Sequence, residues 1–175
     1  MVTGIVTLVV AIFAATVYRA MLLPRGGPKV TTVSLPLEFS MQLERTEFQQ
    51  DKVINVSLTL RNISNSTLVL EWHNGCIFDL VVDDSNRTRV WDWQSFHAYP
   101  EAVFGKTLSS GGSLSYYYWW FQTVPWEGAV GPYPAGQVPK GTCFIKGALF
   151  QFMLTAEGHI ARESVETPAI TITIK

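Results

Sequence analysis

The chain of 175 residues contains little charge and no concentration of one sign. Charged residues make up 15% of it, against about 25% in an average soluble protein. The 13 Lys and Arg nearly balance the 14 Asp and Glu. Binding to nucleic acid phosphates needs clustered Lys and Arg. Because no basic stripe is present, we expect no nucleic acid partner.

The sequence patterns of common catalytic sites are also missing. There is no G-x-S-x-G nucleophile elbow, no phosphate-binding P-loop and no dinucleotide fingerprint. The stretch "SSGGS" at residues 109–113 reads as a turn, because no helix follows it to bind a phosphate at its N-terminus. We therefore expect no enzymatic activity, no cofactor and no small-molecule substrate.

Side chains that bind metals or form disulfides are scarce, with only two Cys and three His. His73 and Cys76 have H-x-x-C spacing, and Cys143 or His97 would have to complete a tetrahedral site. That pattern is weak, and no metal is predicted. Cys76 and Cys143 are instead candidates for a disulfide between two sheets, provided that their Cα atoms lie within about 7 Å.

Apolar residues are abundant, at 47% of the chain, and many of them lie near the N-terminus. Residues 2–18 carry no charge, and after Arg19 the apolar run continues to Leu23. At about 1.5 Å per residue, the uncharged part spans roughly 26 Å and the whole run roughly 33 Å, which brackets a bilayer core. Residues 1–23 are therefore predicted to form a transmembrane anchor, with a cleaved signal peptide or a buried helix as the alternatives.

Two signals disagree on the orientation of such an anchor. Arg19, Arg25 and Lys29 follow the apolar run, and the positive-inside rule then favours a cytoplasmic C-terminal domain. Four Asn open the N-x-S/T pattern of N-glycosylation, which is used outside the cytosol. These are Asn55, Asn62, Asn65 and Asn86. We favour a single-pass membrane protein with an extracytoplasmic domain, although Ser- and Thr-rich strands also create such patterns by chance.

Beyond the anchor, residues 24–34 contain Pro and Gly and are predicted to be a linker to a domain at residues 35–175. In this domain apolar and polar residues alternate, as in "VINVSLTLRN" at residues 53–62. Alternation with period two predicts half-buried strands. About eight such segments, with turn signals roughly every ten residues and no amphipathic helix, predict an all-β fold, an immunoglobulin-like antiparallel β-sandwich.

The stretch "GCIFDLVVDDSNRTRVWDW", residues 75–93, predicts a hairpin. An apolar strand precedes "DDSN", whose side chains favour turns, and a second strand follows. Trp91 and Trp93 share one face of that strand, so we expect both to fill the space between two sheets. A ligand site at these two rings is the alternative. Asp79 and Asp92 are expected to accept hydrogen bonds at turns and edges.

Several further stretches occur in the same order between residues 37 and 174, among them "LRNISNSTLVLEW", "LSSGGSLSYYYWWF" and "VPKGTCFIKGAL". Together with the hairpin they resemble the BsuPI family of intracellular proteinase inhibitors. The resemblance implies structural roles for Phe78, Asp79, Trp91, Trp93 and Trp119. The other matching positions are Val82, Val90, Leu108, Gly111, Ser113, Trp120 as an alternative to Trp119, Pro139, Gly141 and Thr142.

The loop from Thr123 to Lys140 is longer than the family pattern implies and carries apolar residues between prolines. Val124, Trp126, Tyr133 and Val138 are predicted to contact a protein partner. Prolines limit the freedom of a loop, so docking costs less entropy, and aromatic residues on loops are common binding anchors. A plain connection packed against the domain is the alternative.

Two functions remain open at this point. The first is a membrane-anchored inhibitor or regulator of proteases that binds through this loop. The second is an immunoglobulin-like interaction or structural module of a cell-envelope assembly, which binds through an exposed strand edge without inhibiting anything.

Overall fold

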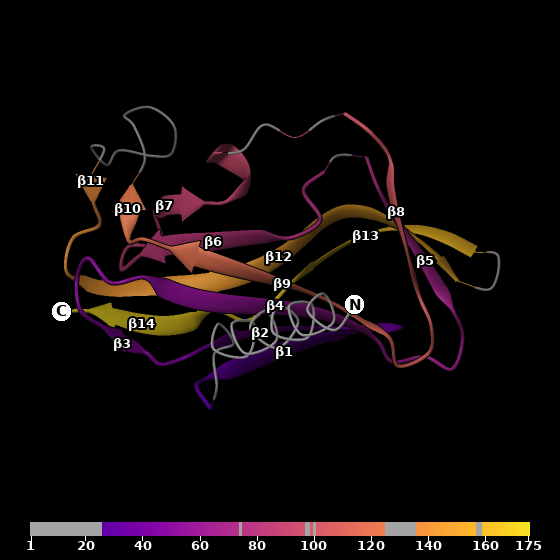
Figure 1. Ribbon diagram of the computed structural model, residues 1–175, viewed down its shortest axis with the longest axis horizontal. Helices are drawn as coiled ribbons and strands as arrows, with labels where there is room; N and C mark the ends of the chain where they lie inside the picture. Colours follow the sequence, from indigo (N-terminus) through magenta and orange to yellow (C-terminus); the bar gives the residue numbers. More distant parts are fainter. Residues whose placement is uncertain (1–25, 74, 97–98, 100, 125–135, 157–158) are drawn as a thin grey trace, which may run out of the picture.

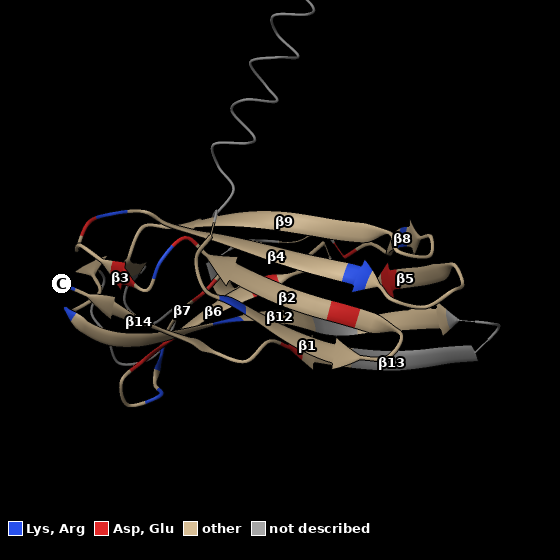
Figure 2. Ribbon diagram, turned by 90° about the horizontal axis from the view of Figure 1, so that it is seen from below, with Lys and Arg blue, Asp and Glu red and all other residues tan. Residues whose placement is uncertain are grey.

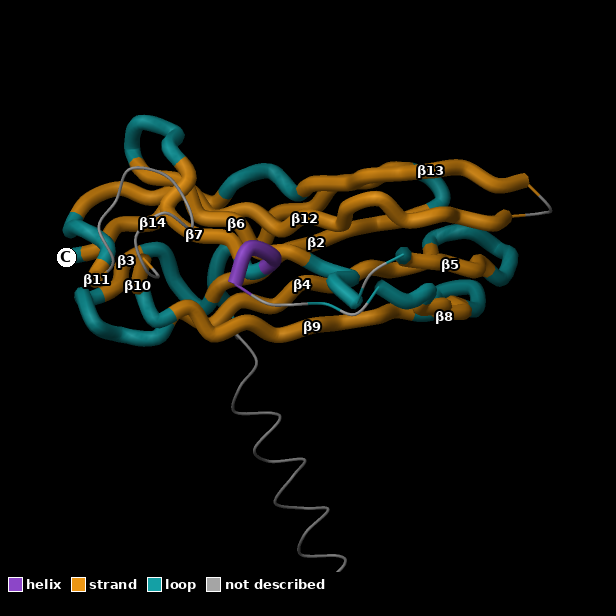
Figure 3. Tube along the Cα trace, turned by 90° about the horizontal axis from the view of Figure 1, so that it is seen from above, coloured by secondary structure: helices purple, strands orange, loops and turns teal. Residues whose placement is uncertain are grey.

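The computed structural model describes residues 26–175 except residues 74, 97, 98, 100, 125–135 and 157–158. In this part of the chain the only helical segment is the short 3-10 turn η1 (Gln94–Phe96). All strand pairs are antiparallel except β3 with β14. The prediction of an all-β chain with antiparallel sheets is therefore confirmed. Figures 1 and 2 show two sheets stacked on one another, with strands that run along the long axis (Figure 3).

The first sheet has four strands in the order β1-β2-β4-β9. Their bounds are Lys29–Ser34 for β1, Leu37–Leu43 for β2, Ile54–Asn62 for β4 and Ser113–Trp120 for β9. β4 has the alternating sequence noted above, and its apolar side chains are buried while most of the intervening polar ones are half-buried. β9 pairs with β4 on one side and ends the sheet on the other.

The second sheet is organised around the long strand β12 (Gly141–Ala156). On one side β12 pairs first with β14 and then with β13, and on the other side first with β6 and then with β5. The bounds are Ile170–Ile174 for β14, His159–Glu166 for β13, Asp79–Asp84 for β6 and Leu68–Trp72 for β5. The edges carry β3 (Glu47–Phe48), β7 (Arg89–Asp92) and β8 (Phe104–Leu108).

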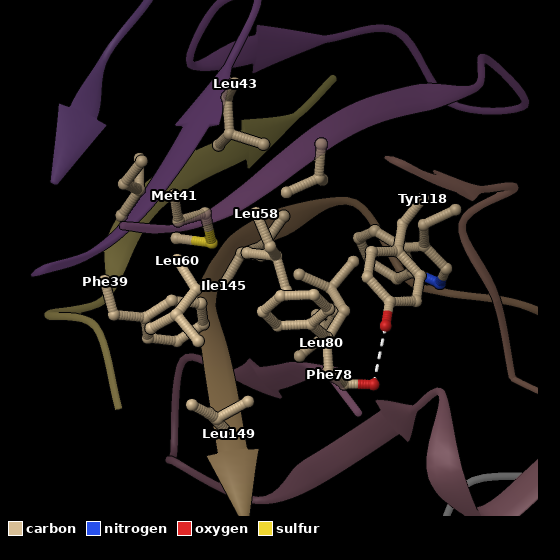
Figure 4. Close-up of a cluster of buried hydrophobic side chains, with 14 of the residues drawn as sticks. Phe39, Met41, Leu43, Leu58, Leu60, Phe78, Leu80, Tyr118, Ile145 and Leu149 are labelled. Atoms are coloured by element: carbon tan, nitrogen blue, oxygen red, sulfur yellow. Dashed lines mark hydrogen bonds between the residues drawn. The ribbon is translucent and has the colours of Figure 1, made fainter. Parts of the chain in front are cut away.

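The facing sides of the two sheets share one apolar core (Figure 4). The first sheet contributes Phe39, Met41 and Leu58, and the second contributes Leu80 and Ile145, all with no solvent exposure. Gly147 in β12 faces the first sheet at short range. A Cβ atom there would lie 2.5 Å from Leu58 Cδ2 and 3.3 Å from Phe39 Cζ, so any larger residue would require the Leu58 side chain to shift.

Residues 29–34, predicted to be part of a linker, instead form β1 and pair along their whole length with β2. The prediction gave weight to the neighbouring Pro and Gly residues. The segment "KVTTVS" itself consists largely of β-branched residues, which favour strands. The predicted anchor, residues 1–23, lies outside the described residues. Among those described, no helix has the length and apolar character needed to span a membrane.

The contact at Gly147 generates a prediction for stability. Gly147→Ala should lower the free energy of unfolding by about 1–3 kcal/mol, because the added methyl group overpacks the space against Leu58. Urea unfolding followed by tryptophan fluorescence measures this. The matched control is Gly105→Ala in β8, where no atom lies within 4 Å of the new Cβ, and stability should not fall.

The loss should also shrink when Gly147→Ala is made in a Leu58→Val background, since the two side chains compete for one space. Equal effects of the two glycine substitutions would contradict the close approach of the sheets.

Candidate functional site

The described ends of the Pro- and Gly-rich loop lie side by side. β10 (Thr123–Val124) and β11 (Gly136–Gln137) pair antiparallel, with Thr123 opposite Gln137. This small hairpin lies at one end of the stacked sheets (Figure 1). The fold therefore gathers both ends of the 125–135 segment at a single place on the molecule.

Gln122 ties this hairpin to the turn between β3 and β4. Its side chain is fully buried, and its Nε2 donates hydrogen bonds to the carbonyl oxygens of Gln49 (2.9 Å) and Lys52 (2.7 Å). The carbonyl of Gln122 accepts a hydrogen bond from the amide of Val138 (2.8 Å). Gln50 Nε2 donates to the carbonyl of Val138 (3.0 Å). The base of the loop is thus held from both strands of the hairpin.

Of the four predicted partner contacts, only Val138 has a described side chain. It is 2% exposed and belongs to the core, so the prediction that it contacts a partner is wrong. The physical reason is that both of its backbone groups bond to Gln residues beneath the hairpin, which turns its side chain inward. Trp126, Tyr133 and the side chain of Val124 lie outside what the structure describes.

The β6–β7 hairpin forms where the sequence predicts it. Asp84 Oδ1 accepts hydrogen bonds from the backbone amides of Asn86 (2.9 Å) and Thr88 (2.8 Å), which closes the turn. Arg89 Nε donates to Asp83 Oδ1 (2.8 Å) across the two strands. These side chains use their polar atoms to shape the turn.

The tryptophans of this hairpin contact the aromatic strand β9. Trp91 is 7% exposed, and its ring lies 6.2 Å from those of Trp93 and Trp120. Trp93 is half-buried, and it meets Tyr118 at 4.9 Å in an edge-on arrangement. The structural role expected for Trp119 is wrong. Trp119 is 42% exposed, whereas Trp120 is 1% exposed, because alternate residues of β9 face opposite sides of the sheet.

Asp79 and Asp92 both accept hydrogen bonds from the first turn of η1. Asp79 Oδ1 accepts from the amide of Gln94 (3.0 Å), and Asp92 Oδ1 accepts from the amide of Ser95 (2.7 Å). Asp79 is 4% exposed. Its burial raises the pKa of the carboxyl group to about 6, although the amide of Gln94 opposes the shift, and the charge of Asp92 adds to it.

Between β9 and the segment before β6 lies an aromatic pocket of about 90 Å³. We define it by its aromatic lining, which consists of Phe78, Trp93, Tyr99, Tyr116 and Tyr118. The sequence analysis did not identify the three tyrosines. A signal was present in "LSYYYWWF", since alternation along one strand places Tyr116 and Tyr118 on the same face as Trp120.

Cys76 and Cys143 are buried thiols, and no disulfide joins them, so that prediction is wrong. Cys143 pairs with Asp84 at one end of β6, whereas Cys76 precedes Asp79 at the other end. These two ends of β6 lie about 17 Å apart at roughly 3.3 Å per residue, well beyond the about 7 Å limit for a disulfide. Burial raises the pKa of both thiols to about 11.

Asn62, a predicted glycosylation site, is completely buried and organises two turns. Its Nδ2 donates to the carbonyl oxygens of Ser66 (2.7 Å), Leu108 (3.0 Å) and Ser109 (3.0 Å). Its Oδ1 accepts from the amide and the hydroxyl of Ser64. This amide is therefore inaccessible to modification in the folded chain. Of the other three predicted sites, Asn55 is half-buried, and Asn65 and Asn86 are exposed.

Within the described part of the chain, no three His, Cys, Asp or Glu side chains lie close enough together to hold a metal ion. His73 is exposed while Cys76 is buried, so the H-x-x-C pair does not present two ligands to one site. His97, the alternative ligand, lies outside the described residues.

The sequence matches the family model of BsuPI, described as intracellular proteinase inhibitor, over residues 41–142. This span contains every element from β3 to β11, and therefore the β6–β7 hairpin, the aromatic strand and the loop. Among curated proteins, none matches the chain.

Solved structures show only distant likeness. The C-terminal domain of wzt has a TM-score of 0.45 at 4% identity, with 84% of this chain and 78% of that chain covered. The putative ApaA protein from Bordetella pertussis has a TM-score of 0.41 at 9% identity, with 79% of this chain and 93% of that chain covered. A β-glucosidase from Erythrobacter marinus has a TM-score of 0.40 at 16% identity, with 83% of this chain and 16% of that chain covered.

The family match corrects the predicted location. The sequence favoured a single-pass membrane protein with an extracytoplasmic domain, whereas the matching family is described as intracellular. The glycosylation patterns that supported the extracytoplasmic orientation fall in strands and turns rich in Ser and Thr. One of the four Asn, Asn62, has a structural role that accounts for its presence.

The buried carboxyl group of Asp79 generates a prediction for pH dependence. Its pKa rises from the ordinary 3.8 to about 6 in the fold. Between these values the folded protein binds more protons than the unfolded chain, so its stability falls as pH rises. Asp79→Asn removes the charge and keeps an acceptor for Gln94. We expect this variant to be more stable than the wild type by about 2–3 kcal/mol near pH 8, and equally stable near pH 3.

Urea unfolding at several pH values measures this difference. Asp51→Asn is the matched control, because Asp51 is exposed and its φ of 64° suits Asn. A difference between Asp79→Asn and wild type that stays constant over the pH range would contradict the account.

Proposed function

The chain belongs to the BsuPI family of intracellular proteinase inhibitors, and from this premise we propose that it inhibits or regulates a protease by direct protein–protein binding. The proposal includes no catalytic role for the chain itself. The observation that carries it is the family match, which covers residues 41–142 and therefore more than half of the chain.

Our proposal assigns the fold to the immunoglobulin-like sandwiches. In support, two largely antiparallel sheets face one another over a single core, and the strands that end each sheet come from distant parts of the sequence. Such sandwiches present their loops at the two ends of the stacked sheets. This arrangement gives a protein-binding loop a rigid support.

The Thr123–Lys140 loop is the proposed contact with the protease. Its ends are joined in a hairpin, and Gln122 fastens that hairpin to the 49–52 turn. A loop whose ends are already fixed loses less conformational entropy when it binds. Of the apolar residues predicted to bind, Val124, Trp126 and Tyr133 remain in the proposal, and Val138 does not because it is buried.

A second candidate function has its own observation. β9 ends the first sheet, is eight residues long, and contains neither proline nor charge (Figure 2). Natural edge strands are usually protected by such residues, because an open edge can pair with another chain. On this alternative, the domain is an interaction module that binds an extended segment of a partner at β9 and inhibits nothing.

Inhibition assays with the full chain test the first function. We expect near-stoichiometric inhibition of at least one protease in a panel of serine, cysteine, aspartic and metalloproteases. Replacement of residues 125–135 by a Gly/Ser segment of equal length should raise the inhibition constant about 100-fold or more, because it removes Trp126 and Tyr133 as anchors. The melting temperature of this variant should stay within a few degrees of the wild type.

Trp119→Lys is the matched variant for the alternative, since it places a charge on the exposed face of β9. Inhibition that survives Trp119→Lys and is lost with the loop supports the loop mechanism. The reverse pattern would show that inhibition depends on β9, and it would contradict the loop as the contact. If the full chain inhibits no member of the panel, the inhibitor proposal is wrong.

A further inference from the structure

The aromatic pocket is a concave feature that the proposed inhibition does not use. Among the described residues, nine line it and none of these is charged, and five of the nine are the aromatic residues that define it. The pocket's volume of about 90 Å³ is well above the roughly 10–15 Å³ that one water molecule needs. It can therefore admit a group of several non-hydrogen atoms.

The rings of the pocket stand at steep angles to one another. Tyr118 and Trp93 lie 4.9 Å apart at an interplanar angle of 76°, and Tyr118 and Tyr116 lie 4.9 Å apart at 50°. Phe78 and Tyr116 are tilted by 38° at 6.4 Å. The four rings therefore pack against one another at an angle, and all four line the pocket. The π face of each ring carries negative potential, whereas the ring edge is positive.

Solvent reaches the pocket past Tyr116, which is 45% exposed, while Tyr118 at the floor is 1% exposed. Trp93 and Tyr99 are half-buried between these two extremes. The hydroxyl group of Tyr118 donates a hydrogen bond of 2.6 Å to the carbonyl of Phe78, so its direction is fixed (Figure 4). The floor and one wall are thereby held in place before any ligand arrives.

A negative charge lies close behind this aromatic lining. Asp79 directly follows Phe78, and its buried carboxyl group bonds to the amide of Gln94. The pKa of the Tyr118 hydroxyl is raised mainly by burial, and the charges of neighbouring acidic groups, Asp79 among them, raise it further. The same carboxylate adds to the burial effect on Cys76 and Tyr99. The Asp79 carboxylate therefore adds a negative charge close to the Tyr118 side of the pocket.

We propose that the aromatic pocket binds a small organic cation with methyl groups on its nitrogen, that is, a quaternary ammonium group. Such a cation is attracted to aromatic faces within about 6 Å and does not require hydrogen-bond acceptors. A primary ammonium group is more strongly hydrated and has three donors that need partners. A neutral apolar group of the same shape would gain the same contact area but nothing from the negative potential.

This inference does not depend on the proposed inhibition. None of the loop residues that the structure describes, 123–124 and 136–140, lines the pocket. A negative inhibition assay would therefore not argue against the cation site. A negative cation titration would not argue against the inhibitor proposal.

The test is a titration of the full chain with choline and with 3,3-dimethylbutan-1-ol, which replaces the charged nitrogen of choline by carbon and keeps its shape. Isothermal calorimetry, or NMR detection of the backbone amides of β9, follows the binding. We expect saturable one-site binding of choline, about tenfold tighter than that of the neutral alcohol. This follows from a cation–π contribution of about 1–2 kcal/mol and the factor of ten per about 1.4 kcal/mol.

Two residues of β9 supply matched variants, because both are exposed and they lie on opposite faces of the strand. Tyr116→Leu removes a wall of the pocket and should weaken choline binding about tenfold, whereas Tyr116→Phe keeps the ring and should retain it. Trp119→Leu removes an exposed ring outside the pocket and should leave binding unchanged. Equal affinity for choline and the alcohol, insensitivity to Tyr116→Leu, or no saturable binding would each overturn the proposal.

Discussion

The hydrogen bond from the Tyr118 hydroxyl group to the carbonyl oxygen of Phe78 joins the two sheets beside the aromatic pocket. It is 2.6 Å long and buried, and it runs from the edge strand β9 to the segment that leads into β6 (Figure 4). The same carbonyl also accepts a weaker bond from Cys76 Sγ (3.2 Å), so loss of the Tyr118 bond alone should cost about 1 kcal/mol. The bond therefore fixes where the edge of the first sheet meets the second, and Trp93 packs against the ring that makes it.

The aromatic pocket and the Thr123–Lys140 loop both depend on the placement of this edge strand. On the side that faces the core, Tyr116 and Tyr118 form part of the aromatic pocket. Four residues after Tyr118 the chain reaches Gln122, whose side chain anchors the loop hairpin to the 49–52 turn. A shift of β9 by one residue would exchange its two faces. The pocket and the base of the loop would then be lost together.

Local sequence patterns predicted the strands and the turn, because their causes are local. Alternation predicted β4, and the Asp and Asn side chains predicted the turn closed by Asp84. Two of the errors concern long-range pairing. The register of β9 on β4, with Trp120 opposite Ile54, decides which tryptophan is buried, and the register of β6 on β12 separates the cysteines. Single-strand patterns contain neither register.

The stability of Tyr118→Phe tests the central role of this hydrogen bond most directly. The variant keeps the ring and removes only the hydroxyl group, and Tyr117→Phe on the other face of β9 is its control. Urea unfolding should show a loss of about 1 kcal/mol for Tyr118→Phe, in which Cys76 Sγ remains as a donor to the Phe78 carbonyl, and a change within about 0.5 kcal/mol for Tyr117→Phe. Equal stability of the two variants would contradict the view that this bond holds the sheets in place.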